Sequence, residues 1–324
     1  MKIAESLTEI ASGVPSVVTL GNFDGVHLGH RELFRRTVQR ARELCVQSVV
    51  YTFDPHPLKV LAPDRAPLLL NTPAEKVRLI EASEIDLLIQ VPFDVQFASQ
   101  PADAFVRDVL VSRLNVQHLV VGYDYAFGRD RLGTPDYLVE QGRRYGFTVE
   151  VLQPLGADGR PYSSTQIRAL IAGGQVSEVV DLLGRHYTFE GRVVPGDQRG
   201  RQLGFPTANL VTDKEQLPAA GVYAVEVRSA GRAHAGVVNI GQRPTFGDGA
   251  TTIEVHLLDF SEDLYGRTLR LYFFKRLRGE HRFAGPEQLR QAISADVLAA
   301  RKVLDEHRVI PYWEYLSQED QLSV

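Results

Sequence analysis

Residues 21–30 form the run Gly-Asn-Phe-Asp-Gly-Val-His-Leu-Gly-His, which constrains the fold more than any other stretch of this sequence. The apolar stretch 17–20 precedes it, and a charged pattern typical of a helix follows from residue 31. This order predicts a strand, a tight glycine turn and the first turn of a helix. A helix N-terminus presents unpaired N–H groups and a partial positive charge, so it suits phosphate.

His27 and His30 stand three residues apart at this expected helix start. Imidazoles in that place can donate hydrogen bonds to a phosphate that is being transferred. Histidines that merely cap a glycine turn are the alternative, and a metal site is disfavoured because no third His or Cys lies at a ligand spacing. The glycines, the strand and the helix start together favour the phosphate site.

The chain has 324 residues, enough for two domains, and 44% of them are hydrophobic, enough for real cores. The net charge of −4 gives the chain no overall positive potential that would attract a polyanion. Neither nucleic acid nor an anionic membrane is therefore expected as a partner. The single cysteine, Cys45, excludes a disulfide framework and a multi-cysteine zinc site. We see neither a signal-peptide pattern nor an apolar run near the roughly 20 residues of a membrane span, and expect a cytoplasmic protein.

The first half of the chain alternates strand-like and helix-like patterns. Strands are expected at 17–20, 48–53, 86–91, 117–122 and 147–152, and helices at 31–44, 73–82, 101–114 and 135–145. Two short helices, 165–172 and 176–183, close this half. The alternation predicts an α/β domain, residues 1–184, with a parallel, doubly wound, Rossmann-like sheet. Ligands bind such sheets beyond the carboxyl ends of the strands, where residues 21–30 lie.

The second half, residues 185–324, is rich in Val, Tyr, Phe and Thr and has Gly- and Pro-rich turns. Strands are expected at 187–194, 222–228, 235–240, 252–258 and 269–274. This pattern predicts a small antiparallel β-barrel. A helix is expected from Pro286 to about His307, with an apolar stripe at Leu289, Ile293, Val297, Ala300 and Leu304.

The segment Ser163-Ser164-Thr165-Gln166-Ile167-Arg168 is expected to open one of the short helices. Its hydroxyl groups can cap the helix, and Arg168 can fork onto phosphate oxygens at any relevant pH. A plain cap with a solvated arginine is the alternative. Beside the histidine pair, the segment becomes a second phosphate-binding group.

A glycine-punctuated basic stretch, 191–204, leads to Pro206-Thr207-Ala208-Asn209. Backbone N–H groups of this stretch, together with Arg199 or Arg201, can close over phosphates. Thr207 and Asn209 point to the same side of an extended segment, and their oxygens suit Mg²⁺. A hairpin loop with solvated arginines is the alternative.

Glu254 lies on the expected strand 252–258 and shares one strand face with His256. A carboxylate on a barrel strand is usually a solvated outer residue. Beside a phosphate loop, however, it is a candidate general base for a hydroxyl nucleophile.

The histidine motif and the late Ser-Ser-Thr-x-x-Arg resemble the nucleotidyltransferase superfamily that transfers AMP from ATP. Within it, Phe53-Asp54-Pro55-His56-Pro57 and the stretch 122–128, Gly-Tyr-Asp-Tyr-Ala-Phe-Gly, resemble the FMN adenylyltransferase module. The resemblance implies catalytic roles for His27, His30 and Arg168. It implies nucleotide binding by Gly21, Phe23, Gly29, Asp124, Ser164 and Thr165, and flavin binding by Pro55, Pro57 and Phe127.

The stretch from Gly191 to Asp296 resembles riboflavin kinase. This resemblance implies Glu254 as the base, Thr207 and Asn209 as the residues that hold Mg-ATP, and Gly196, Arg199 and Gly204 as nucleotide-binding residues. Arg278 and Phe283 are candidates for the flavin side. Over nearly its whole length, the chain resembles the bacterial bifunctional riboflavin kinase/FMN adenylyltransferases. The family implies that ATP converts riboflavin to FMN, and that a second ATP converts FMN to FAD and pyrophosphate, with Mg²⁺ as cofactor.

Three other interpretations remain open. The chain could be a monofunctional enzyme that forms FMN and no FAD, but the presence of His27, His30 and Arg168 argues against this. It could be a regulatory protein that binds a flavin or nucleotide, although binding alone needs no base such as Glu254. It could be linked to RNA, because class I tRNA synthetases share His-x-Gly-His, but it lacks their Lys-Met-Ser-Lys-like loop. A P-loop kinase is excluded, because no Gly-x-x-x-x-Gly-Lys-Ser/Thr occurs. The sequence leaves the oligomeric state open.

Overall fold

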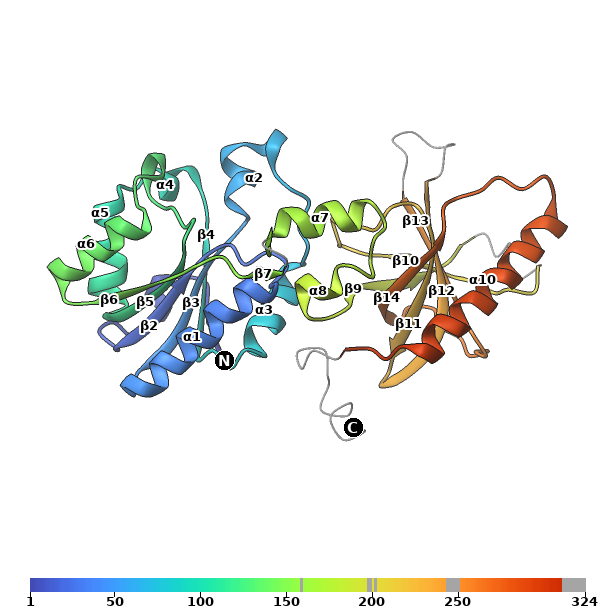
Figure 1. Ribbon diagram of the computed structural model, residues 1–324, viewed down its shortest axis with the longest axis horizontal. Helices are drawn as coiled ribbons and strands as arrows, with labels where there is room; N and C mark the ends of the chain where they lie inside the picture. Colours follow the sequence, from blue (N-terminus) through green and yellow to red (C-terminus); the bar gives the residue numbers. More distant parts are fainter. Residues whose placement is uncertain (158–159, 197–199, 201–202, 243–250, 311–324) are drawn as a thin grey trace. The chain divides into compact units, whose positions relative to one another are not determined.

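The computed structural model describes residues 1–324 except 158–159, 197–199, 201–202, 243–250 and 311–324. The chain divides into two compact units, Met1–Ser164 and Thr165–Val324 (Figure 1). The two short helices that the sequence pattern assigns to the first half group with the second unit. The domain boundary after residue 184 stays a prediction.

The first unit contains a six-stranded sheet in the order β1-β4-β3-β2-β5-β6, and every neighbouring pair of strands is parallel. This confirms the predicted α/β fold. The strands are β1 (Lys2–Ala4), β2 (Ser16–Leu20), β3 (Gln47–Asp54), β4 (Leu87–Pro92), β5 (Val116–Gly122) and β6 (Thr148–Leu152). Strand β1 was not predicted, because three residues carry too little periodicity. The winding reverses between β2 and β5, so the segments that follow these two strands are where ligands of such sheets bind.

Helices connect the parallel strands of this unit, as the alternating pattern predicts. They are α1 (Leu28–Leu44), α2 (Pro57–Leu61), α3 (Pro73–Glu81), α4 (Val95–Ala98), α5 (Ala102–Ala104), η3 (Phe105–Arg113) and α6 (Pro135–Tyr145). The single helix expected at 101–114 is divided into α5 and η3, and η3 has π-helical hydrogen bonding. A short hairpin, β7 (Gly156–Ala157) and β8 (Arg160–Pro161), completes the unit.

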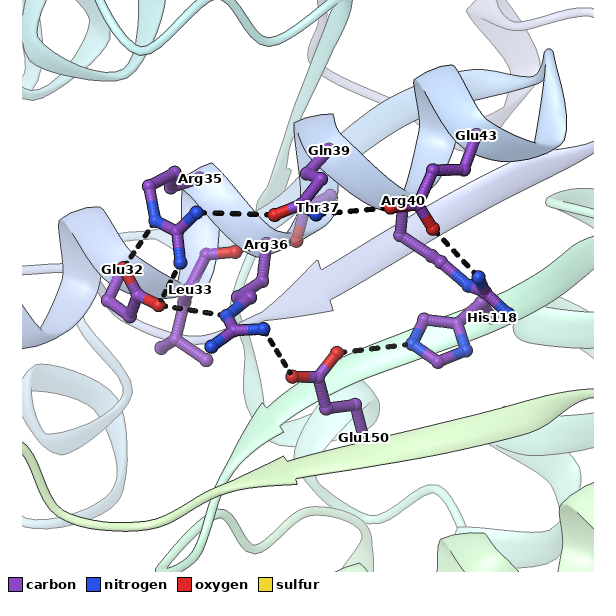
Figure 2. Close-up of polar contacts among 10 residues, drawn as sticks. All are labelled: Glu32, Leu33, Arg35, Arg36, Thr37, Gln39, Arg40, Glu43, His118 and Glu150. Atoms are coloured by element: carbon purple, nitrogen blue, oxygen red, sulfur yellow. Dashed lines mark hydrogen bonds and ion pairs between the residues drawn. The ribbon is translucent and has the colours of Figure 1, made fainter.

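Helix α1 packs against β2, β3 and β5 and carries the histidine motif at its N-terminus. A polar network runs along α1 and reaches β5 and β6 (Figure 2). Arg35 and Arg36 both donate hydrogen bonds to Glu32, and these bonds hold the pKa of Glu32 below its usual value. Arg36 also lies 3.7 Å from Glu150 of β6, whose other oxygen lies 3.7 Å from Nε2 of His118 on β5. These contacts tie the helix to the sheet and so fix where its N-terminus lies.

The second unit contains a closed antiparallel barrel in the order β10-β13-β12-β11-β14-β9, which confirms the second predicted fold. Its strands are β9 (Tyr187–Val194), β10 (Ala208–Val211), β11 (Gly221–Ser229), β12 (Arg232–Gln242), β13 (Thr251–Leu257) and β14 (Thr268–Arg278). Strand β10 was expected only as an extended segment, because four residues are too short for a clear alternation. It nevertheless pairs with both β9 and β13 and closes the barrel.

Within the described part of the second unit, three helices accompany the barrel. They are α7 (Ser164–Ala172), α8 (Val180–Leu183) and α10 (Pro286–Glu306). The prediction of a helix over 176–183 is wrong in its first four residues. Residues 176–179 form turns, and α8 begins at Val180. Helix α10 packs Val297, Ala300 and Val303 against apolar side chains on the outside of the barrel, among them Val222 of β11. None of the described helices combines the length and apolar composition that a membrane crossing requires.

Candidate functional sites

The turn after β2 holds a backbone conformation that few sequences allow. Phe23, Gly25 and Val26 all have positive φ, at 52°, 86° and 40°. A Cβ on Gly25 would lie 2.7 Å from Cδ1 of Leu70, so both its φ and its surroundings call for glycine. The buried Phe23 ring meets His30 edge-on at a centroid distance of 5.4 Å. The turn therefore packs the aromatic side chain against one of the two predicted catalytic histidines.

Asp24 joins three segments of the first unit, a role that the sequence analysis missed. Its buried carboxylate accepts the backbone N–H of Leu70 at 2.9 Å and that of Asn71 at 3.2 Å. Its carbonyl oxygen accepts the hydroxyl of Ser164 at 2.8 Å. The only sequence signal was an acidic residue beside a turn glycine, and such residues are usually solvated. The bond places predicted nucleotide-binding Ser164 against the motif.

His27 is the N-cap of α1, and its Nδ1 accepts the backbone N–H of His30 at 3.3 Å. The two imidazoles stack at a centroid distance of 3.6 Å. A neutral imidazole whose Nδ1 accepts carries its proton on Nε2, which becomes the ring's donor. A Cβ on Gly29 would lie 3.1 Å from Cε1 of His27, so the glycine allows the ring to lie against the helix. His27, Gly29 and His30 therefore lie together at the N-terminus of α1, and their roles stay predictions.

The end of β3 holds the segment predicted to line a flavin pocket. Lys76 of α3 donates from its ammonium group to the carbonyl of Phe53 at 3.0 Å, and burial lowers the pKa of Lys76. His56 caps α2 by accepting the N–H of Leu58 at 3.2 Å, and Pro57 is the first residue of that helix. Sequence reasoning did not single out Lys76, because lysines on helices are usually exposed. The flavin-binding role of Pro55 and Pro57 stays a prediction.

Asp124 and Phe127 both lie in the segment after β5, but Asp124 faces solvent whereas Phe127 packs against the core. Asp124 is exposed, and its Oδ1 would lie 3.3 Å from a Cβ on Gly122. The Phe127 ring packs against the core, at centroid distances of 5.3 Å from Phe105 and 5.7 Å from Tyr125. Only the part of the ring that these neighbours leave uncovered can meet a ligand.

Thr165 and Arg168 lie on α7, within a helix that begins at Ser164 as expected. Both belong to the second of the two compact units. Their roles in phosphate binding stay predictions.

The register of the barrel aligns the predicted kinase residues in one row. Glu254 of β13 lies opposite Asn209 of β10 on one side and Asn239 of β12 on the other. The row continues through Val222 of β11 to Arg278 of β14. Directly opposed residues have Cβ atoms about 5 Å apart. Glu254 is half-buried on the outer face of the barrel, while its neighbours Ile253 and Val255 point into the core, as the strand pattern predicts.

The predicted phosphate loop meets Asn209 closely. A Cβ on Gly196 would lie 2.0 Å from Nδ2 of Asn209, so this close approach requires glycine. A Cβ on Gly200 would lie 3.1 Å from Oγ1 of Thr207. His256, which shares a strand face with Glu254, contacts the carbonyl of Pro206 through Nδ1 at 2.8 Å. It thereby holds the segment that carries Thr207.

Gly204 and Arg199 are also predicted to bind the nucleotide, and the structure describes only the glycine. Gly204 has a φ of 87°, which favours glycine. Arg199 lies outside the described residues.

The donor atoms beside Asn209 fit a hard cation. The side chains of Thr207, Asn209 and Glu254 supply oxygen atoms, which Mg²⁺ prefers. Among the described residues, no group of three or more His, Cys, Asp or Glu could hold a metal ion. A metal here would therefore depend on hydroxyl and amide oxygens, on phosphate and on water.

Arg278 and Phe283, the predicted flavin-side residues, lie together. The Arg278 guanidinium donates to both oxygens of Asp296 on α10, at 2.8 to 3.1 Å, and lies 5.5 Å from the centre of the Phe283 ring. The buried Asp296 thus links α10 to the end of β14. In the sequence, Asp296 was only the last residue of the stretch that resembles riboflavin kinase. No pattern in the neighbouring residues indicates that Arg278 is its partner.

Two family models match the chain: FAD synthetase over residues 10–166 and riboflavin kinase over residues 183–304. A protein of Pseudomonas fluorescens described as a bifunctional riboflavin kinase/FMN adenylyltransferase is 45% identical over 286 residues. The alignment covers 88% of this chain and 92% of that protein. An Escherichia coli K12 protein of the same description is 41% identical over 287 residues, with the same coverage. A crystal structure described as a macrolide-efflux protein from Streptococcus pneumoniae has a TM-score of 0.84 and 34% identity, covering 92% of this chain and 98% of that one.

Proposed function

The chain belongs to the bifunctional riboflavin kinase/FMN adenylyltransferase family, and we propose that its two reactions use two separate sets of residues. It phosphorylates riboflavin with ATP to give FMN, and it transfers AMP from a second ATP to FMN, giving FAD and pyrophosphate. One observation carries the division: the stacked histidines belong to the parallel-sheet unit, whereas Glu254 and Asn209 belong to the barrel.

In the kinase reaction, the 5′-hydroxyl of the ribityl chain attacks the γ-phosphate of ATP. Glu254 accepts the hydroxyl proton, since within the described part of the chain no hydrogen bond or ion pair engages its carboxylate. Thr207 and Asn209 hold Mg²⁺, which neutralises charge on the phosphates when it is bound. The backbone at Gly196 and Gly204 encloses the nucleotide. Arg278 and Phe283 lie on the flavin side of the row.

In the adenylyltransferase reaction, the FMN phosphate attacks the α-phosphate of ATP. This phosphate is already anionic, so the protein supplies position and charge stabilisation rather than a nucleophile. The Nε2–H of His27 and the N–H groups that begin α1 face developing negative charge. His30 and the hydroxyl of Ser164 add further donors within the same unit.

Single substitutions separate the two sites. Glu254→Gln removes the base, so FMN formation from riboflavin falls by at least about 10²-fold while FAD formation from FMN is unchanged. His30→Ala removes one stacked donor, so FAD formation falls by about 10²- to 10³-fold while FMN formation is unchanged. Chromatography of the flavins measures both rates on each variant, which makes each reaction the folding control for the other. Loss of both activities in either variant, at normal thermal stability, contradicts the two-site assignment.

A cytoplasmic location is also part of this proposal. It rests on the single cysteine, Cys45, which is exposed and free and so suits a reducing compartment. The partners of the chain are its small-molecule substrates.

A further inference from the structure

Lys76 is a partly buried cation of the parallel-sheet unit, and neither proposed reaction gives it a role. It lies on α3, and its ammonium group donates to the carbonyl of Phe53, at the end of β3, at 3.0 Å. Burial lowers the pKa of Lys76, while the carboxylates of Asp54 and Asp24 favour its charged form. The ammonium group is therefore held at the carboxyl edge of the parallel sheet, where ligands of such folds bind.

The carboxylates around Lys76 are each held by hydrogen bonds. Asp24 is buried and accepts two backbone N–H groups of the segment before α3, at 2.9 and 3.2 Å. Asp54 accepts the side-chain amide of Gln90 at 3.0 Å. Glu75, which precedes Lys76 on α3, is buried and accepts a backbone N–H at the start of that helix at 3.0 Å. These bonds satisfy oxygen atoms but cancel no negative charge, whereas the ammonium group supplies the opposite charge.

This group of carboxylates lies close to the proposed phosphate site. Asp24 stands three residues before His27, so their Cα atoms are at most about 11 Å apart. FMN and ATP bring the negative charge of their phosphates to the N-terminus of α1, which begins at Leu28. At an effective dielectric constant of about 20, two unit charges about 10 Å apart change a dissociation constant by about 10-fold. The charge of Lys76 is therefore large enough to affect how tightly these substrates bind.

We propose that Lys76 is the counter-ion of the adenylyltransferase site, where its ammonium group offsets the carboxylates of Asp24 and Asp54 so that the phosphates of FMN and ATP can bind. This inference rests on the proposed adenylyltransferase function. Lys76 touches no reacting atom in this role, and it sets the electrostatic potential in which the phosphates bind. Loss of its charge therefore raises the KM values, whereas displacement of the histidines would lower kcat.

The first test compares variants that remove or keep the charge. Lys76→Gln keeps an N–H donor for the carbonyl of Phe53 but carries no charge, so the KM values for ATP and FMN in FAD formation each rise by about 10-fold. Lys76→Arg keeps the charge and restores the low KM values. Lys2→Gln is the matched control, because Lys2 is an exposed lysine on β1 of the same unit, and it leaves both KM values unchanged.

Two inhibitors of FAD formation separate the effect of charge from an effect of shape. Pyrophosphate, the anionic product, binds Lys76→Gln about 10-fold more weakly than it binds the wild type. Adenosine carries no charge and binds both proteins equally. FMN formation from riboflavin, measured on every variant at a fixed concentration of free Mg²⁺, reports on the integrity of the chain.

The pH dependence gives an independent measurement. Because burial lowers the pKa of Lys76, the wild-type ammonium group loses its proton below the usual lysine pKa of about 10.4, and the KM for FMN rises there. The guanidinium group of Lys76→Arg stays charged, so its KM for FMN stays level over the same range. Parallel profiles of the two proteins contradict a role for the charge of Lys76.

Wild-type KM values in Lys76→Gln overturn the inference, and so does a fall in kcat at unchanged KM. Adenosine binding that weakens as much as pyrophosphate binding has the same meaning. His30→Ala distinguishes this failure from that of the proposed function. If His30→Ala forms FAD at the wild-type rate, the site assignment itself fails. If His30→Ala loses FAD formation while Lys76→Gln keeps the wild-type KM values, only the role of Lys76 fails.

Discussion

Gly29→Ala changes the adenylyltransferase site through a single methyl group. The new Cβ would lie 3.1 Å from Cε1 and 3.2 Å from Nδ1 of His27. Non-bonded carbon atoms prefer about 3.5–4.0 Å, so the imidazole must move by roughly 0.5 Å. Misplacement of a catalytic group by about 1 Å costs about 10²-fold in rate, so we expect kcat for FAD formation to fall by about 10-fold.

The same substitution is expected to stabilise helix α1 while it lowers activity. Gly29 lies in the first turn of α1, and alanine favours a helix over glycine by up to about 1 kcal/mol. The midpoint of thermal unfolding should therefore stay level or rise while activity falls. A loss of stability that parallels the loss of activity would point to general damage instead.

The assay follows FAD formation from FMN and ATP by chromatography, and FMN formation from riboflavin serves as the internal control. We expect the effect in kcat rather than in the KM for ATP, because the phosphate-binding N–H groups of α1 are unchanged. Wild-type kcat for FAD formation in Gly29→Ala would refute the idea that this contact positions His27.

Three further predictions concern the barrel unit. Gly196→Ala forces the backbone away from Asn209, so FMN formation should fall at least 10-fold with FAD formation from FMN unchanged, as flavin chromatography would show. Asp296→Ala leaves Arg278 without its bidentate partner, and calorimetry should show a loss of about 2 kcal/mol of barrel stability. Burial lowers the pKa of His186 to about 4. The unfolded chain therefore takes up the proton first, and stability present above pH 6.5 is lost as the pH falls toward 4, by about 2 kcal/mol at pH 5. His186→Gln should flatten that dependence in urea titrations, and an unchanged slope would contradict it.

The sequence by itself determined both fold classes, because the signals for them are local. Alternation with period 2, helical periodicity and turn glycines act over a few residues, so β9, α1 and the turn before His27 could all be predicted. The short strands β1 and β10 could not, because three or four residues do not establish a period.

Only the tertiary structure decided which distant residues face one another. Asn209, Glu254 and Asn239 lie on three separate strands, and their alignment depends on the register of the closed barrel. A slip of one residue would turn each side chain to the other face, and burial of the whole core sets that register rather than any local pattern. Asp24 shows the same limit: its carboxylate holds backbone N–H groups 46 and 47 residues further along the chain. Such contacts exist only once the segments between them have folded.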